Sequence, residues 1–330
     1  MKKRPTHNPE LNFIKDDWKG NFVNHKNQYV NLIKPSERSY NDLFKWLTGK
    51  NQFKSLKKNQ QSPFSVSTNE YKPNDRQDGL YYIGHATFLF TLHGKNIITD
   101  PVLFNVGPVK RMSPMPFKPE ELTQVDYILL SHNHRDHLDK KSLQLICKQN
   151  PNAIILTALQ ISTLLNKWRI KNKIVEAGWY QSYALDEEFN VHFLPAKHWN
   201  RRGLLDLNQM LWGSFLIESK IKTIYFGADS GYCVHFEEIG KLFRKIDYAI
   251  LGIGACEPEW FMKSSHTSPE RAFKAFQDLG AKHLIPMHYG TFDLSDEPLF
   301  YPEEELKKLI TASGKKEHVL FPQLGNKMYF

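Results

Sequence analysis

The chain has 330 residues, of which 41% are hydrophobic and 13% aromatic, and it carries a formal net charge of +9. This composition supplies a large apolar core and excludes a chain that is disordered throughout. No stretch reaches the ~18 consecutive apolar residues of a transmembrane helix, and we expect no signal peptide because no apolar region follows the charged start. Three cysteines without a CxxC pair exclude a disulfide scaffold and favour a reducing, cytoplasmic location. The positive charge favours an anionic partner, which can be nucleic acid, a phosphorylated metabolite or a membrane face.

The N-terminal part of the chain differs in composition from the rest. Residues 1–77 are rich in Lys, Asn and Gln, and we interpret them as an N-terminal extension. The polar, turn-rich residues 60–79 are predicted to close this extension as a linker. The regular pattern that follows predicts one folded unit, residues 78–330.

Residues 39–59, SYNDLFKWLTGKNQFKSLKKN, form the most distinctive segment of this extension. Leu43, Phe44 and Leu47 recur at helical spacing, with Trp46 beside them and several lysines after them. A basic amphipathic segment of this kind either lies in a membrane interface or packs on the domain as a short helix with a solvated lysine face. The pattern leaves both alternatives open.

Short apolar runs and helical patterns alternate along residues 78–330. The predicted strands are 80–92, paired with 96–101 across a Gly-containing turn, and then 126–132, 153–159, 189–198, 211–219, 222–230, 248–255 and 283–288. The predicted helices are 141–150, 161–168, 268–280 and 303–314. Strand pairs followed by strands that alternate with helices predict an α/β sandwich with the sheets inside.

The helix predicted over 268–280 has the clearest boundaries. Ser268 is a typical N-cap, and Pro269 occupies the first helical position. Gly280 closes the end of the helix.

Four metal-binding side chains occur within six residues, at the end of the strand predicted over 126–132. His132, His134, Asp136 and His137 stand in HNHRDH, where the strand becomes a loop. Neutral imidazole and carboxylate are the ligands that borderline divalent metals prefer. A single helix or strand cannot turn all four side chains inward, whereas a strand-to-helix loop can. A surface loop that is rich in histidine is the alternative.

Three further side chains of the ligand type follow predicted strands downstream. They are His198 in PAKHW, Asp229 in FGADSG and His288 in IPMHYG. Open α/β sheets collect their sites at the carboxyl ends of strands, so we expect these side chains to converge. The full set is large enough for two metal ions about 3.5–4 Å apart, bridged by one carboxylate and one hydroxide.

The HxHxDH motif, together with His198, Asp229 and His288, resembles the metallo-β-lactamase superfamily. From about Phe22 to the C-terminus the chain also resembles the N-acyl-phosphatidylethanolamine-hydrolysing phospholipase D family, in GHATFLF, ITDP, PAKHW, LWGSF, YFGADSGYC, FEEIG, IGACEPEWFMKSSH, SPERA and HYGTF. HxHxDH alone indicates only the superfamily, whereas HWNRRG and EPEWFMKSSH are much more particular. The resemblance implies an αββα sandwich as the catalytic domain, residues 78–330, with a dinuclear metal site between the sheets.

The resemblance also implies a role for each ligand. It places His132, His134 and His198 on one zinc, Asp136, His137 and His288 on the other, and Asp229 between the two. Iron or manganese would suit the same ligand set. On the first hairpin, Asp100 is expected to orient a ligand histidine from the second coordination sphere. His85 is expected either beside it or simply in the core.

The implied reaction is hydrolysis of N-acyl-phosphatidylethanolamine, or of related glycerophosphoethanolamine lipids, to an N-acylethanolamine and phosphatidic acid. His266, in KSSHTSPE, matches a functional position of the family and is expected to protonate the leaving group or to hold the phosphate. Its alternative is a structural neighbour of the Ser268 cap. Arg135 and Ser265 stand where we expect Tyr and Gln in the animal enzymes. Arg135 either pairs with a phosphate or remains solvated.

An apolar cluster of Trp260, Phe261 and Met262 stands just before His266. These side chains either line a cavity for acyl chains, face the bilayer or pack in the core. The resemblance further implies a homodimer that binds peripherally to an anionic membrane, and the basic segment 39–59 fits such binding.

Other functions remain open from the sequence. A nucleic-acid phosphodiesterase of the same superfamily fits the net charge of +9, but we find no added nucleic-acid domain and expect no nucleic-acid partner. A lactonase acting on a soluble sugar phosphate would share the metals and the GHAT and DP elements. A non-catalytic membrane adaptor stabilised by metal is the alternative from a different class.

Overall fold

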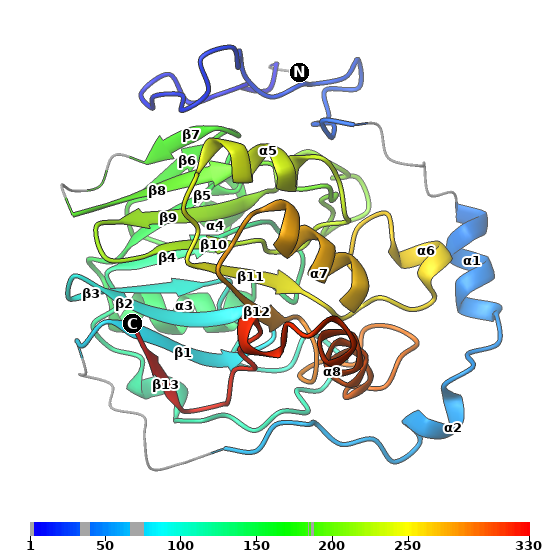
Figure 1. Cartoon of the computed structure of the whole chain (residues 1–330). Coiled ribbons are helices and arrows are strands. Elements are labelled where there is room, and N and C mark those ends of the chain that lie inside the picture. The colour runs from blue at the N-terminus through cyan, green and yellow to red at the C-terminus, as the bar shows by residue number, and fades with distance from the viewer. Residues whose placement is uncertain (1–2, 34–39, 67–75, 184, 186–187) are drawn as a thin grey trace.

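The computed structural model describes residues 3–33, 40–66, 76–183, 185 and 188–330. Two β-sheets pack face to face with helices on both outer sides (Figure 1), so the predicted αββα sandwich is confirmed. One sheet has seven strands in the order β13-β1-β2-β3-β4-β5-β6. The other has six, in the order β12-β11-β10-β9-β8-β7.

The seven-stranded sheet starts as an antiparallel meander and continues as a parallel sheet. Its strands are β1 (Gly79–Gly84), β2 (Thr87–Leu92), β3 (Lys95–Thr99), β4 (Tyr127–Leu130), β5 (Ile154–Ala158), β6 (Ile174–Ala177) and β13 (Lys327–Tyr329). Every residue of β1 and β2 is buried, because the sheet is covered on both faces. The single strand predicted over 80–92 is wrong. The chain turns back at His85, which has a positive φ of 59°, and forms two strands there.

The six-stranded sheet mixes both kinds of pairing. Its strands are β7 (Gln181–Tyr183), β8 (Phe189–Leu194), β9 (Ser214–Ser219), β10 (Thr223–Phe226), β11 (Tyr248–Gly252) and β12 (His283–Met287). Strand β9 runs antiparallel to both β8 and β10, and β10, β11 and β12 are mutually parallel. The carboxyl ends of β8, β10, β11 and β12 therefore meet at one edge of the sheet.

The helices divide between the two faces of the sandwich. They are α1 (Tyr40–Thr48), α2 (Lys54–Lys57), α3 (Lys140–Gln149), α4 (Ser162–Lys167), α5 (His235–Leu242), α6 (Glu259–Met262), α7 (Pro269–Asp278) and α8 (Tyr301–Ser313), with 3-10 turns at Pro119–Glu121 and Lys316–His318. Helices α5, α7 and α8 lie on the side of the six-stranded sheet, and α3 and α4 lie on the opposite side (Figure 1).

Helix α7 shows how the sequence sets these boundaries. The Ser268 side chain accepts a hydrogen bond from the Arg271 amide, and Gly280 follows the helix with a positive φ of 62°, so the predicted caps are confirmed. The short elements β6, β13 and α6 were not predicted, because their few residues carry no clear periodic pattern.

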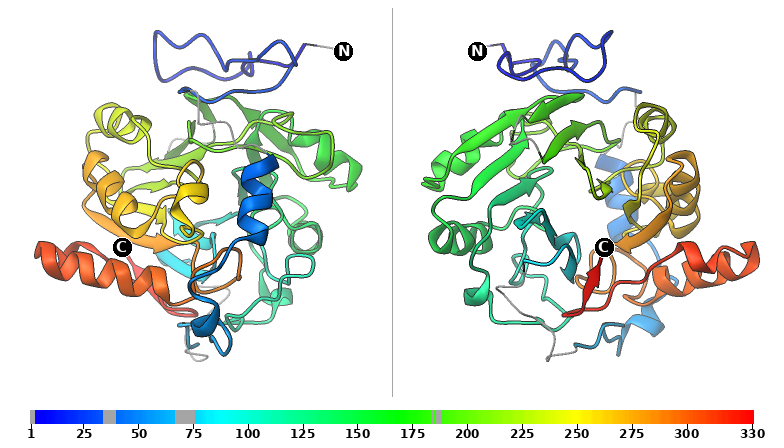
Figure 2. Two further views of the ribbon diagram at one scale, coloured as in Figure 1. Left: turned by 90° about the vertical axis from the view of Figure 1, so that its right-hand side faces the viewer. Right: turned by 60° about the vertical axis from the view of Figure 1, so that its left-hand side comes forward.

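The segment 40–66 runs along one side of the sandwich, with α1 beside α6 (Figure 2). Among the described residues, no helix combines the length and apolarity needed to cross a membrane. Cys147, Cys233 and Cys256 are all free, as expected from their spacing.

Candidate metal centre

Three histidines converge at the carboxyl ends of β4 and β8. His132 and His134 stand on the histidine loop, defined as residues 131–139 after β4, and His198 follows β8. His134 Nδ1 lies 3.0 Å from His132 Nε2 and 3.1 Å from His198 Nε2. Burial holds the pKa of His134 at about 4 and those of the other two well below the usual range, so all three rings are neutral. Three nitrogens with lone pairs to donate thus face one point.

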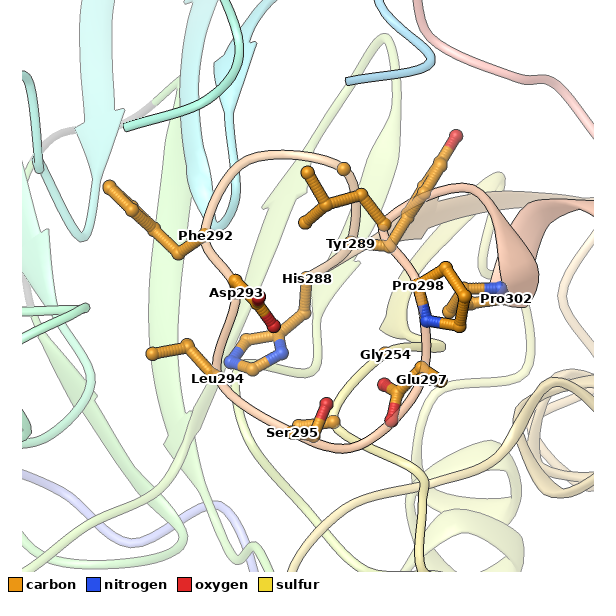
Figure 3. Close-up of a pocket in the computed structure, with 13 residues that line it drawn as sticks. Gly254, His288, Tyr289, Phe292, Asp293, Leu294, Ser295, Glu297, Pro298 and Pro302 are labelled. Carbon is orange, nitrogen blue, oxygen red and sulfur yellow. The ribbon is translucent and has the colours of Figure 1, made fainter. Parts of the chain in front are cut away.

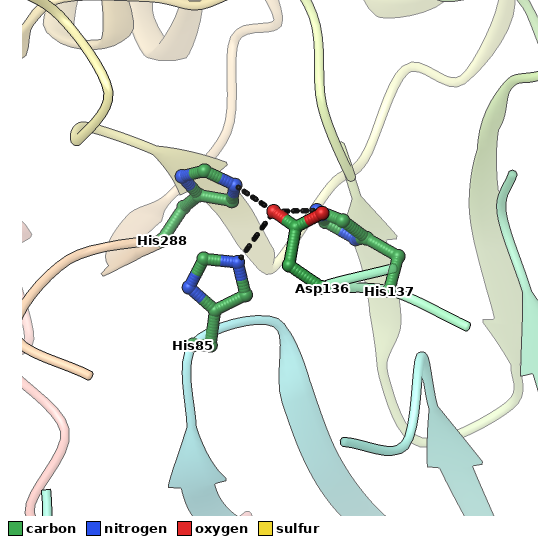
Figure 4. Close-up of side chains that lie close together, drawn as sticks. All are labelled: His85, Asp136, His137 and His288. Atoms are coloured by element: carbon green, nitrogen blue, oxygen red, sulfur yellow. Dashed lines mark hydrogen bonds and ion pairs between the residues drawn. The ribbon is translucent and has the colours of Figure 1, made fainter. Parts of the chain in front are cut away.

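A second group forms beside the first, from the histidine loop and two other strand ends (Figure 4). Asp136 Oδ2 lies 3.5 Å from His288 Nε2, 3.7 Å from His137 Nε2 and 3.2 Å from His85 Nε2. His288 directly follows β12, and His85 occupies the turn between β1 and β2. One carboxylate and three imidazoles, all buried or nearly so, therefore meet in one place.

Asp229, at the end of β10, reaches both groups. Its Oδ2 lies 3.2 Å from His137 Nε2, and its Oδ1 lies 3.1 Å from His288 Nε2. The same Oδ2 lies 3.6 Å from His198 Nε2 and 3.8 Å from His132 Nε2. A carboxylate in this position can bind one ion in each group.

The donor atoms fit divalent metal ions. Ligand atoms ~2.0–2.1 Å from a tetrahedral ion lie roughly 3.3 Å from one another, which matches the separations in both groups. His137 Nε2 and His288 Nε2 are buried and make no hydrogen bond, although Asp229 lies beside them. Buried polar atoms almost always have a partner, so these two nitrogens indicate lone pairs directed at a cation.

The charges of the second group also favour a cation. Burial alone would lower the pKa of His288, but Asp229 and Asp136 raise it to about 9. Burial is likewise outweighed at His137, where the carboxylates of Asp229 and Asp136 and the hydrogen bond to Asp100 hold the pKa well above its usual range. The two carboxylates favour positive charge at this point. Without metal, protons on His288 and His137 supply that charge in place of a metal cation.

Asp100 fixes the orientation of the histidine loop. Its carboxylate accepts hydrogen bonds from the Ser131 amide at 2.8 Å, from the Ser131 hydroxyl at 2.5 Å and from His137 Nδ1 at 2.8 Å. Ser131 Oγ also lies 2.9 Å from His132 Nδ1. The sequence predicted this kind of role for Asp100 but missed Ser131, which directly precedes the motif.

Arg202 holds the same loop from the outside. Its Nη1 donates to the carbonyls of Asn133 at 2.9 Å and Leu138 at 2.7 Å. Arg202 therefore gives the HWNRRG segment a structural role. From the sequence, a role was predicted only for its histidine, His198, as a metal ligand.

His85 is fully enclosed and contacts a ligand of the second group. Burial lowers its pKa to about 3, so the ring is neutral. Its amide donates to Thr291 Oγ1 at 3.0 Å, and its carbonyl accepts from the His288 amide at 3.0 Å. A neutral ring that donates its Nε2–H to Asp136 Oδ2 would orient this carboxylate toward the metal group.

His266 lies at the border of the two groups. Its Nδ1 is 3.7 Å from Asp229 Oδ2, and its ring centre is 5.3 Å from those of His198 and His288. It follows Ser265, whose backbone carbonyl accepts a hydrogen bond from His198 Nδ1 at 3.0 Å. The Ser265 residue is buried, so its observed contact is with a candidate ligand, and its predicted contact with substrate stays a prediction.

The other residues predicted to meet the substrate differ in accessibility. Arg135 is exposed on the histidine loop. In the apolar cluster, Trp260 is 43% exposed, whereas Phe261 and Met262 are buried. Phe261 stacks on Trp46 with ring centres 4.9 Å apart, which joins α6 to α1.

Comparisons with known proteins agree with this geometry. A family model described as a beta-lactamase superfamily domain matches residues 95–289. The chain is 34% identical over 254 residues to an N-acyl-phosphatidylethanolamine-hydrolyzing phospholipase D of Caenorhabditis elegans, covering 72% of this chain and 71% of that protein. It is also 34% identical over 257 residues to the mitochondrial enzyme of the same name from Saccharomyces cerevisiae, covering 74% of this chain and 54% of that protein.

Solved structures share the fold at low sequence identity. A metallo hydrolase from the archaeon Ignicoccus hospitalis superposes with a TM-score of 0.59 at 21% identity, covering 76% of this chain and 97% of that one. This similarity supports the fold and carries nothing about the substrate.

Proposed function

As a member of the beta-lactamase superfamily and, within it, of the N-acyl-phosphatidylethanolamine-hydrolysing phospholipase D family, this chain is a metal-dependent hydrolase, and we propose that it cleaves N-acyl-phosphatidylethanolamine. The products are an N-acylethanolamine and phosphatidic acid. The observation that carries the proposal is the position of Asp229, whose carboxylate lies within 3.1–3.8 Å of nitrogens in both histidine groups. Such a paired site is suited to in-line displacement at phosphorus.

We assign two zinc ions to this site, with iron and manganese as alternatives for the same donors. The residues that would hold them are His132, His134 and His198 for one ion, Asp136, His137 and His288 for the other, and Asp229 for both. When bound, the two ions supply an activated water and neutralise charge on the phosphate oxygens.

The chain's own residues orient the phosphate and handle the leaving group. Water adds to phosphorus, the bond from phosphorus to the ethanolamine oxygen breaks, and that oxygen takes up one proton. His266, whose Nδ1 lies 3.7 Å from Asp229 Oδ2 at the border of the two groups, is the proposed proton donor. Arg135, exposed beside the ligands, is proposed to pair with the phosphate as it enters.

A membrane surface is the proposed source of the substrate. Helix α1 docks on the domain through Trp46, whose Nε1 donates to Asp296 Oδ1 at 3.0 Å. Its apolar face remains in solvent, with Leu43, Phe44 and Leu47 exposed by 39%, 68% and 69%. Exposed apolar residues next to basic ones are typical of interfacial helices, so peripheral binding to anionic lipid is part of the proposal.

Two leucines form a second exposed tip beside the histidine loop. Leu204 and Leu205 are 86% and 89% exposed and follow closely after Arg202, which holds that loop. The tip adds to the proposed lipid-facing surface around the site. A homodimer is proposed on the family resemblance alone.

The test is head-group release from mixed micelles. N-acyl-phosphatidylethanolamine and phosphatidylethanolamine are compared with and without chelator, using the wild type, Asp136→Asn and the surface control Asp17→Asn. We expect phosphatidic acid and N-acylethanolamine from the wild type and the control, and their loss with chelator or Asp136→Asn. If the zinc-loaded wild type leaves both lipids intact, the proposal fails, and lactones of sugar phosphates and soluble phosphodiesters become the substrates to try.

A further inference from the structure

The loop after His288 forms one wall of the candidate metal centre. The His288 loop, defined as residues 288–299, curls around the imidazole of His288 (Figure 3). A cavity of ≈ 10 Å³ lies against this ring, and Asp293, Ser295 and Glu297 contribute to its lining. The loop therefore encloses one side of the His288 ring.

A distant part of the chain holds this loop. We define the strap as residues 46–64, which run from the last turn of α1 through α2. Three contacts involve the middle of the loop: Lys57 Nζ donates to Asp293 Oδ1 at 2.5 Å and to the Ser295 carbonyl, and Gln60 Nε2 donates to Asp293 Oδ2 at 2.7 Å. Two contacts involve Asp296, which accepts from Trp46 Nε1 at 3.0 Å through Oδ1 and from Asn51 Nδ2 at 3.1 Å through its carbonyl. At the ends of the loop, the Leu299 amide donates to Gln60 Oε1 at 2.9 Å, and Ser62 Oγ donates to the Gly290 carbonyl at 2.6 Å.

Aromatic packing reinforces these bonds at both ends of the strap. Trp46 stacks on Phe261, and Phe64 lies 5.1 Å from the ring of Tyr289, the residue next to His288. Gly290 has a positive φ of 69°, and a Cβ there would run into the Phe64 ring. The close approach of strap and loop thus depends on this glycine.

The centre of the loop relies on the strap most. Its two flanks are hydrogen-bonded to other parts of the domain. The Met112 amide donates to the Thr291 carbonyl, and the Cys256 and Glu257 amides donate to the Glu297 carboxylate. Between them, Asp293 and Ser295 receive their hydrogen bonds from Lys57 and Gln60. The Lys57 side chain is 16% exposed and that of Asp293 is 36% exposed, so their charge-assisted bond is partly shielded from solvent.

We infer that the strap is a positioning element of the second metal group, in which Lys57 and Gln60 act through Asp293 to hold His288 in place. The inference rests on the proposed two-metal function. The group of His132, His134 and His198 has no contact with the strap among the described hydrogen bonds, so the two metals should respond differently when the strap is loosened.

The test measures metal retention in the full-length protein. Wild type, Lys57→Met and Asp293→Asn are loaded with zinc and dialysed against increasing chelator, and bound zinc is counted by mass spectrometry. Lys54→Met is the matched control, because Lys54 is an exposed lysine of the same helix α2. Lys57→Arg is the conservative variant that should restore the bond.

We expect the first zinc to stay in every protein, and the second to be lost from Lys57→Met and Asp293→Asn at chelator concentrations at least tenfold lower. The control and Lys57→Arg should match the wild type. Cobalt substitution should show the same selective loss as a decrease in one part of the visible absorption. Retention of the first metal shows that the variants are folded.

Equal retention of both zincs in all variants would overturn the inference and leave the proposed function intact. Simultaneous loss of both zincs would also overturn it, because the strap would then support the whole fold and no particular ligand. A wild type that binds one zinc at most would instead defeat the two-metal proposal, and the inference with it.

Discussion

The histidine loop and the His288 loop bring ligands to the same centre in opposite ways. The histidine loop carries His132, His134, Asp136 and His137 within six residues, and Asp100 and Ser131 close beside it fix its geometry. The His288 loop carries one ligand and is held by Lys57, 236 residues away in sequence. A local motif specifies half of the site, whereas long-range packing specifies the other half.

The largest expected effect comes from Asp229, the residue whose carboxylate reaches both metal groups. Asp229→Asn should lower kcat/KM for N-acyl-phosphatidylethanolamine on the order of 10³-fold, because it removes the charge shared by the two groups. Steady-state kinetics with metal-saturated protein provides the measurement, and Asp17→Asn serves as control. A loss of less than about tenfold would mean that the two groups do not act together.

A change of pH should separate the two groups. The pKa of His288 is raised to about 9, so this ring keeps its proton in the metal-free protein until the pH approaches that value. The raised pKa stabilises the metal-free fold fully below the unfolded pKa of ~6.5, and this contribution is lost as the pH rises through about 9.

Metal binding should show the reverse dependence, since a metal requires the neutral ring. Binding of the second metal must displace the protons of both His288 and His137, whose pKa values are raised. We therefore expect the affinity of the second metal to rise at least about tenfold per pH unit between pH 7 and 9. The affinity of the first should change much less, because burial already keeps His134 neutral with a pKa of about 4. Competition titrations with a chelating dye at several pH values measure both. Parallel curves for the two metals would contradict the difference between the groups.

The support of the histidine loop can be tested at Asp100. Asp100→Asn keeps the shape of the side chain but weakens its bond to His137, and it should lower metal affinity by ~10–100-fold. Isothermal titration with zinc measures the effect. Unchanged affinity would show that the loop holds its own geometry without this carboxylate.

The smallest expected effect concerns the exposed face of α1. Phe44→Ser with Leu47→Ser should weaken binding to anionic vesicles roughly tenfold, because two apolar side chains no longer enter the interface. Ile221→Ser is the control, since Ile221 is also exposed but lies in the turn between β9 and β10, at the edge away from the site. Co-sedimentation provides the readout, and equal binding by all three proteins would remove α1 from the proposed membrane surface.

The same contrast explains what the sequence could predict. HNHRDH, His198, Asp229 and His288 each follow an apolar strand, so their convergence follows from the rule that sites gather at the carboxyl ends of strands. The turn at His85 was missed because GHAT lies between two apolar runs that together have the pattern of one long strand.

The strap could not be predicted for a different reason. Residues 60–79 have the composition of a linker, and part of this stretch lies outside the described residues. Gln60 and Ser62 nevertheless bind the His288 loop through contacts that join positions more than 200 residues apart. No local periodicity encodes such a pairing, which arises only when the sandwich has formed. The division into an extension, 1–77, and a catalytic domain, 78–330, stays a prediction.

The most direct test of the account is hydrolysis of N-acyl-phosphatidylethanolamine in water enriched in oxygen-18, with both products analysed by mass spectrometry. If the paired site directs water to phosphorus, one labelled oxygen appears in phosphatidic acid and none in the N-acylethanolamine, and chelator abolishes the incorporation. Label in the N-acylethanolamine would mean that the carbon–oxygen bond breaks, and would contradict the proposed reaction.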